Sequence, residues 1–172
     1  MKPKLVSELS ATCTTGRCRE DDLIDFMIDG VSLRESLLRQ EGARGRLKPN
    51  SSLPHFNGLL RRVLAHYIDV FRTGYSNRRI AAHSSLAPVI TCECGEPSCG
   101  GVWTNVFVGG KYVNWSGLRF WNTGPELPGP TYDGSIQVFD RIQYEETLTS
   151  LVGKIERLEN ESAEQAGDAK RD

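Results

Sequence analysis

Long hydrophobic runs are absent from this chain of 172 residues. No apolar segment approaches the roughly 20 residues that a helix needs to span a bilayer. Residues 1–4 are not followed by the apolar core of a signal peptide. We therefore expect a cytoplasmic protein with no membrane association, in which thiols stay reduced. Five cysteines are an odd number, which also argues against a complete disulfide framework.

A strong excess of charge and the common catalytic motifs are missing as well. The net charge is −1, so no overall field attracts nucleic acid. The chain contains no phosphate-binding Walker loop, no dinucleotide-binding fingerprint and no nucleophile elbow. The acidic pairs Asp21-Asp22 and Glu145-Glu146 consist of adjacent residues, which face different directions and do not suit acid/base catalysis.

The composition that remains predicts one compact α+β domain. Hydrophobic residues make up 38% of the chain, enough for a sizeable core. We expect this domain over residues 23–160, with a mostly antiparallel sheet, a β-meander, covered by two main helices. Residues 1–22 are interpreted as an irregular N-terminal segment. Residues 161–172 are polar and lack an apolar stripe, which predicts a disordered C-terminal tail.

Local patterns predict the first strand and two helices. Apolar residues alternate through Leu23–Asp29, which is typical of a strand. Ser32 and Glu35 have the spacing of a capping box at the start of a short helix. Apolar residues recur at helical spacing over 59–71, and Gly74 is placed to end that second helix.

The second half of the chain predicts the meander. Strands are expected at Ala87–Cys94, Gly101–Val108 and Lys111–Ser116, with a two-residue turn at Gly109-Gly110. This turn places Phe107 opposite Tyr112, Val106 opposite Val113, and Trp103 opposite Ser116.

The end of the chain predicts a last strand and a terminal helix. The strand is expected at Ile136–Phe139, and Asp140 then caps the helix. Gln143 occupies the return position of a capping box, and Phe139 and Tyr144 form a hydrophobic staple. The buried stripe of this helix is predicted to contain Tyr144, Leu148, Leu151, Val152, Ile155 and Leu158.

The densest chemical signal is a turn with three cysteines, Cys92, Cys94 and Cys99. Zinc prefers four Cys or His ligands in a tetrahedron, and His83 is a candidate for the fourth position. Cys13 and Cys18 are alternatives for that position. The competing interpretation is that these small apolar side chains only pack in a tight turn. The expected cofactor is therefore either none or zinc.

Positive charge is concentrated in residues 34–79, which carry ten Lys/Arg and three Asp/Glu residues, a net +7. An acidic protein partner would be steered towards this region. Candidate partner-binding residues are Arg61, Arg62, Arg78, Arg79 and Trp121. Nucleic acid is a disfavoured partner, because the aromatic residues of 103–121 suit cross-strand packing and no RNA-binding signature accompanies them.

Four motifs together resemble a family of small, stand-alone, uncharacterised bacterial proteins that are common in actinobacteria. The resemblance covers roughly residues 23–158. It implies a shared fold more than a function, because the family brings no established activity. Its motifs are matched by Asp29-Gly30-Val31-Ser32-Leu33, Cys92-Glu93-Cys94-Gly95 with Cys99, Val113-Asn114-Trp115, and Phe139-Asp140-Arg141 with Gln143, Tyr144 and Leu148.

The function hypothesis that follows is a non-enzymatic, intracellular protein-binding module. By analogy with other small stand-alone bacterial domains, its partner would be a toxin that it neutralises as an immunity protein. The main alternative is a zinc-binding regulatory or nucleic-acid-binding module that uses Cys92, Cys94 and Cys99. An enzyme with a cysteine or metal centre is a third hypothesis.

Overall fold

The computed structural model describes residues 9–15, 22–43, 58–74, 85–92, 100–121, 132 and 136–168. Its elements are three helices and eight strands in these ranges, and every strand pairing among them is antiparallel. The fold class is therefore α+β, as the sequence predicted. None of the helices in the described ranges combines the length and apolar character that crossing a bilayer requires.

The strands form two sheets instead of the one that the sequence suggested. In the first sheet β2, Asp22–Ile28, pairs on one edge with β1, Leu9–Thr15. On its other edge β2 pairs with two short strands, β3 at Val31–Ser32 and β4 at Leu59–Leu60. The predicted strand at Leu23–Asp29 is confirmed to within one residue at each end.

Strand β1 corrects the expectation that residues 1–22 are irregular. Seven residues of that segment pair continuously with β2, from Leu9 opposite Ile28 to Thr15 opposite Asp22. The local pattern is weak, because only Leu9 and Ala11 supply apolar side chains to one face. Pairing with β2 and burial of Leu9, which is 0% exposed, make the strand, and neither is visible in the local sequence.

The second sheet is the predicted meander, with its strands in the order β5-β6-β7-β8. The four strands are β5, Leu86–Thr91; β6, Gly101–Val108; β7, Tyr112–Trp121; and β8, Ile136–Asp140. Neighbouring strands are antiparallel throughout, and a register shift interrupts both the β5–β6 and the β6–β7 pairing.

The register of the β6–β7 hairpin differs from the prediction. Val108 pairs with Val113, and Val106 lies opposite Trp115. The connection is thus two residues longer than a Gly109-Gly110 turn, and the Gly109 N–H bonds the Tyr112 carbonyl at 2.8 Å. Neither of these glycines has a positive φ, which a tight two-residue turn requires. Near the turn the longer loop shifts the register by two residues and so keeps each side chain on its face. Beyond the irregularity between Trp103 and Asn105, Trp103 lies opposite Arg119 instead of the predicted Ser116.

Thr91 joins the two sheets. Its N–H bonds the Gly58 carbonyl at 2.9 Å, and its hydroxyl oxygen accepts the Leu60 N–H at 3.4 Å. A Cβ atom at position 58 would lie 2.7 Å from the Ile24 carbonyl oxygen, so the close approach of the two backbones requires glycine there.

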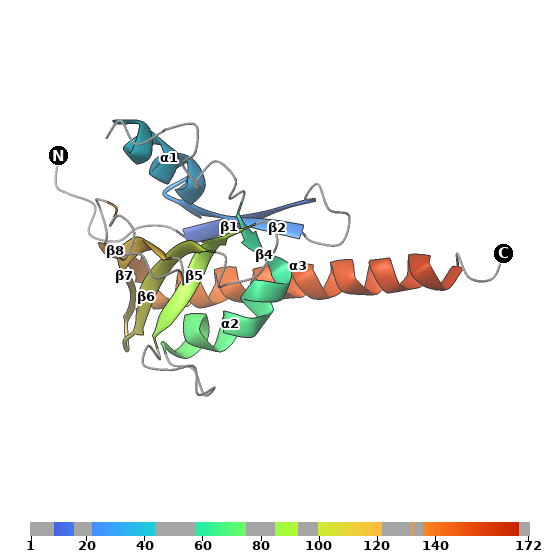
Figure 1. Ribbon diagram of the computed structural model, residues 1–172. Coiled ribbons are helices and arrows are strands. Elements are labelled where there is room, and N and C mark those ends of the chain that lie inside the picture. Colours follow the sequence, from blue (N-terminus) through green and yellow to red (C-terminus); the bar gives the residue numbers. More distant parts are fainter. Residues whose placement is uncertain are drawn as a thin grey trace.

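Helix α1, Leu33–Ala43, and helix α2, Arg61–Thr73, begin and end near the predicted signals. The Ser32 hydroxyl accepts the Glu35 N–H at 3.1 Å, as the capping box requires. Gly74 ends α2 in the left-handed conformation, and its N–H bonds the Val70 carbonyl. In Figure 1 the first sheet lies between α1 and α3, and α2 lies against the meander.

Helix α3, Arg141–Asp168, begins at its predicted cap. Asp140 Oδ1 accepts the N–H groups of Ile142 at 3.0 Å and Gln143 at 3.2 Å. The helix continues to Asp168, which corrects the expectation of disorder from residue 161. Its C-terminal part extends away from both sheets in Figure 1. Glu161, Glu164 and Ala166 in this part are residue types with high helix propensity.

The core is centred on Trp115, which is 0% exposed. Its ring contacts Phe26 of β2 and Phe71 of α2 at centroid distances of 5.2 and 5.7 Å. It also contacts Phe139 of β8 at 5.2 Å and Tyr144 of α3 at 6.2 Å. One side chain of the meander therefore packs against the first sheet and two helices. The Phe139–Tyr144 pair, 5.7 Å apart, is the predicted staple.

Removing the Asp140 cap should destabilise the fold. Asp140→Ala loses the oxygen that accepts two helix N–H groups, so the free energy of unfolding should fall by about 0.5–2 kcal/mol. Asp140→Asn keeps a side-chain oxygen and should lose much less. Urea denaturation followed by circular dichroism compares the variants. Wild-type stability in the alanine variant would mean that the side-chain cap contributes nothing.

Candidate functional site

Of the proposed metal ligands, the structure describes Cys92, which is half-buried just after β5. Its N–H bonds the Gly100 carbonyl at 3.3 Å, so the residues on either side of the cysteine turn lie together. Cys94, Cys99 and His83 lie outside the described residues. Within the described ranges no group of three or more His, Cys, Asp or Glu side chains is placed to hold a metal ion.

Three of the five proposed partner-binding residues lie in the described part of the chain. Arg61 and Arg62 occupy the first turn of α2, where Arg62 is exposed. Trp121 ends β7 and lies under the Arg119 guanidinium, whose carbon is 4.9 Å from the ring centroid. Arg78 and Arg79, and all of the Gly/Pro-rich loop 122–134 except Tyr132, lie outside the described residues. Tyr132 is buried, and its N–H bonds the Leu118 carbonyl at 2.9 Å.

Gln143 does not close the expected capping box but fastens β1 to α3. Its Oε1 accepts the Leu9 N–H at 3.3 Å, and its Nε2 donates to the Leu9 carbonyl. The Thr147 hydroxyl donates to the same carbonyl at 3.0 Å. We call these contacts of Gln143 and Thr147 with the Leu9 backbone the Leu9 clamp. Gln143 thus gives Leu9 the donor and acceptor that a neighbouring strand would otherwise provide.

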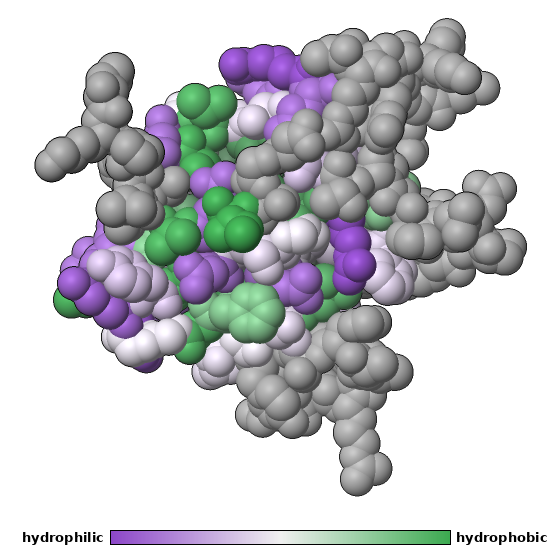
Figure 2. All heavy atoms as spheres, turned by 90° about the vertical axis from the view of Figure 1, so that its left-hand side faces the viewer, coloured by the Kyte–Doolittle hydropathy of each residue, from purple (hydrophilic) through white to green (hydrophobic). Residues whose placement is uncertain are grey.

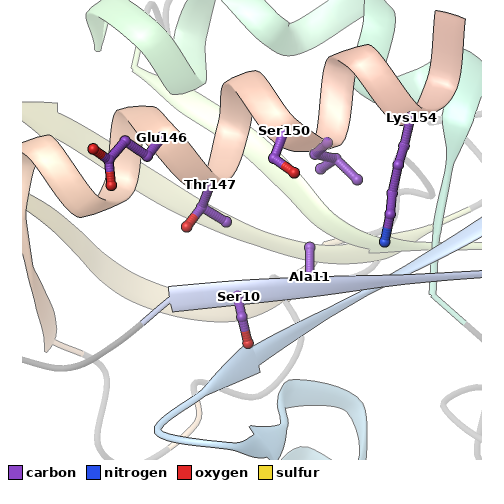
Figure 3. Close-up of a pocket in the computed structure, with 7 residues that line it drawn as sticks. Ser10, Ala11, Glu146, Thr147, Ser150 and Lys154 are labelled. Atoms are coloured by element: carbon purple, nitrogen blue, oxygen red, sulfur yellow. The ribbon is translucent and has the colours of Figure 1, made fainter.

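A groove continues from the clamp between β1 and α3. It encloses about 290 Å³. In Figure 3 Thr147, Ser150 and Lys154 extend from α3 towards β1, whereas Ala11 points from β1 towards the helix. Hydroxyl groups, a cation and the carboxylate of Glu146 therefore line one wall, and the backbone of Ser10 and Ala11 forms the other.

The edge of β1 that faces this groove is open within the described part of the chain, where β2 is its one strand neighbour. The N–H and C=O groups of Leu9 point away from β2, as their hydrogen bonds to side chains of α3 show. Backbone orientation alternates along a strand, so Ala11 and Cys13 turn theirs the same way. The clamp ends at Leu9, and beyond it no strand of the described ranges pairs with this edge.

A second hollow, of about 320 Å³, lies between α1 and the ends of both sheets. Its lining combines apolar side chains, among them Leu37, Leu118 and Val31, with the polar side chains of Asp29, Ser36, Gln40 and Gln137. Asp29, Gln40 and Gln137 already have interactions within the fold. Most polar side chains of this hollow are therefore engaged within the protein itself.

The outer face of the meander carries exposed apolar side chains. Cross-strand pairing places Phe107 beside Asn114, and Ser116 beside Ile136. Phe107 is 53% and Ile136 is 68% exposed. Figure 2, which views the molecule from the left-hand side of Figure 1, shows apolar patches interrupted by hydrophilic side chains. Isolated apolar residues of this kind are common on protein surfaces and do not define a binding site.

Asp25 is a half-buried carboxyl group in β2. Burial raises its pKa above the ordinary value, and a hydrogen bond from the Ser32 hydroxyl partly offsets this. Because the Ser32 hydroxyl also accepts the Glu35 N–H, Asp25 is tied to the start of α1. A raised carboxyl pKa favours the folded state as the pH falls through it, so this group opposes acid unfolding.

Comparison with known proteins adds no further information on function. No protein-family model matches the chain, and neither a curated protein nor a solved structure matches it. Any functional argument therefore depends on the geometry of the chain itself.

Sequence reasoning missed the groove because one wall, β1, was not predicted and the role of Gln143 on the other wall, helix α3, was wrong. β1 was taken as irregular, and Gln143 was assigned to its own helix terminus. A glutamine and a threonine one helical turn apart, at positions 143 and 147, were the available signal, since such residues share one face of a helix. Nothing local indicates that this face meets Leu9, 134 residues earlier.

Breaking the clamp should loosen β1. Gln143→Ala leaves the Leu9 N–H without its acceptor, at an expected cost of about 1–3 kcal/mol. Amide hydrogen exchange along β1 should accelerate more than exchange along β6. Thr147→Val removes one of two donors to the Leu9 carbonyl and should have a smaller effect. Unchanged β1 exchange in Gln143→Ala would contradict a clamping role.

Proposed function

We propose that this protein is a non-enzymatic, intracellular protein-binding module, whose partner adds an extended segment to the open edge of β1. The observation that carries the proposal is the combination of this edge with the adjoining groove. An exposed strand edge is a template for another strand, with main-chain hydrogen bonds giving affinity and adjacent pockets giving specificity.

The Leu9 clamp supports this mode of binding. At Leu9 the side-chain amide of Gln143 stands in place of a peptide group, since it bonds both the backbone N–H and the carbonyl. A partner strand would continue the same pattern at Ala11. The clamp also holds β1 in place, so less conformational entropy is lost when the partner binds.

The groove wall on α3 would select among extended segments. Thr147 and Ser150 offer hydroxyl groups, and Lys154 and Glu146 offer opposite charges eight residues apart along the helix. A segment that places an acidic side chain near Lys154 and a basic one near Glu146 fits this arrangement. Charge complementarity of this kind contributes mainly specificity and association rate.

A toxin remains the partner class that we propose, with the protein acting as its immunity protein. The support is the resemblance to small stand-alone bacterial proteins, together with a binding edge that needs no catalytic group. The basic region 34–79 would steer an acidic partner during the encounter. Arg61 and Arg62 on α2 are its described members that the sequence singled out.

A zinc-binding module is the second candidate, favoured by one specific contact. The Cys92–Gly100 hydrogen bond brings together the two ends of the cysteine turn, so that Cys92 lies near the residue that follows Cys99. Zinc sites of the structural type require such closure, since four ligands must converge on one ion.

The binding proposal is tested by site-specific crosslinking in cells. A photo-crosslinking amino acid at Ser150, in the groove, should trap a partner. The same amino acid at Thr149, which is exposed but does not line the groove, should not. The trapped protein is then purified, and its affinity for the wild-type chain is measured by calorimetry.

Variants at Ala11 test the strand edge with that purified partner. Ala11→Pro removes the outward N–H and should weaken binding about 2- to 10-fold, the range expected for one hydrogen bond. Ala11→Ser keeps the N–H and should bind like the wild type. Equal crosslinking from positions 149 and 150, or unchanged affinity in a folded Ala11→Pro variant, would remove strand addition as the mode of binding.

The zinc candidate is tested by metal analysis of purified protein. If it holds, about one zinc ion per chain is expected, and a chelator should lower the melting temperature. Cys94→Ser and Cys99→Ser should each abolish the bound metal, whereas Ser98→Ala, in the same turn, should retain it. If the purified protein contains no metal and the chelator does not change its melting temperature, the cysteines only pack in the turn.

A further inference from the structure

Two nitrogen atoms of the meander are buried without an acceptor. They are Nε1 of Trp103 in β6 and Nε of Arg119 in β7, and neither has a hydrogen-bond partner within the described part of the chain. Trp103 is 8% exposed, so its indole is more than nine-tenths buried. Donors in this condition are uncommon, because most buried polar groups in proteins are hydrogen-bonded.

The two donors belong to neighbouring side chains. Trp103 and Arg119 are directly paired across β6 and β7, so both side chains lie on one face of the sheet. Trp121 follows Arg119 by two residues and shares that face, and its ring lies 4.9 Å from the guanidinium carbon. On the other side Tyr67 of α2 packs edge-on against Trp103, 5.5 Å between centroids.

The aromatic contacts hold both donors in place. The indole is fixed between its strand and Tyr67, and the guanidinium is stacked on Trp121. Neither of these two nitrogens has an acceptor among the described residues, although each unsatisfied buried donor costs about 1–3 kcal/mol. Two such donors therefore lie side by side, and an acceptor from a ligand would satisfy both.

We propose that Trp103 and Arg119 form a binding site for a carboxylate group. A carboxylate has two oxygens and a negative charge. One oxygen can accept the indole N–H, while the group also pairs with the planar guanidinium, for which Arg is well suited. The proposal does not depend on the β1 groove, since no residue is shared between the two sites.

The source of the carboxylate is either a small organic acid or an acidic side chain of a bound protein. Both present the same chemistry to Trp103 and Arg119. Because both nitrogens are inaccessible to solvent, entry of either ligand requires a local movement. Such movement predicts slower association than a surface ion pair would show.

The indole N–H resonances report on this site directly. The chain has three tryptophans, and nitrogen-15 labelling gives each one indole signal. Acetate, and separately a short peptide that contains one Asp and is acetylated and amidated at its ends, are titrated into the labelled protein at constant ionic strength. We expect the Trp103 signal to shift and saturate. The Trp115 signal is the internal control, because its N–H already donates to Tyr144 at 3.2 Å.

Variants and a matched peptide identify the groups involved. Trp103→Phe assigns the signal by its loss. Arg119→Gln should weaken carboxylate binding about 10- to 100-fold, the range for a hydrogen bond to a charged group. An unmoved Trp115 signal in Arg119→Gln shows that the core is intact. A peptide with Asn in place of Asp should not saturate the site.

The titrations also distinguish the source and can overturn the proposal. Saturation by acetate alone points to a small acid, and saturation by the Asp peptide at much lower concentration points to a protein side chain. If neither moves the Trp103 signal, or if chloride or phosphate moves it equally, the carboxylate site is wrong. Binding that survives in Arg119→Gln would exclude the paired-donor arrangement.

Discussion

The packing around Trp115 is the interaction on which the rest of the structure depends. Its ring lies on the inner face of the meander and touches aromatic residues from β2, α2, β8 and α3. Such pairs contribute about 0.5–1.5 kcal/mol each beyond their buried area. The indole N–H is satisfied by the Tyr144 hydroxyl, and burial raises the pKa of Tyr144, so the hydroxyl stays protonated. Trp115 belongs to the meander, and its contact with Phe26 packs the first sheet against it.

Trp115 and Trp103 show how position decides the role of one residue type. Both are buried tryptophans on neighbouring strands, yet the indole N–H of Trp115 has an acceptor and that of Trp103 has none. Trp115 is surrounded by elements of its own chain. Trp103 is paired with Arg119, a second donor, which cannot satisfy it. Helix α3 has a similar double role, since one of its faces contributes Tyr144 to the core and another holds Leu9 and lines the groove.

Sequence patterns predicted the elements whose signals are local. The Ser32 and Asp140 caps, the Gly74 stop and the strand at Leu23–Asp29 depend on residues within a few positions of one another. The structure has all four. Strand β1 was not predicted, because its Ser- and Thr-rich sequence gives a weak local signal and the clamp at Gln143 lies 134 residues away. The β6–β7 register was wrong because it depends on loop length, which two adjacent glycines did not fix. Trp121 was proposed as a partner-binding residue from its position in the sequence, whereas its contact with the Arg119 guanidinium comes only from the structure.

The sequence by itself determined the fold class, the order of most elements, and the faces that they bury. These properties follow from hydrophobic period and from capping residues, which act over one or two turns of chain. Only the tertiary structure decided that there are two sheets, that β1 presents an open edge beside α3, and that Trp103 and Arg119 lie together. The reason is that an unpaired backbone edge or an unsatisfied donor is defined by what surrounds it. Those surroundings come from segments that are distant in the chain and close in space.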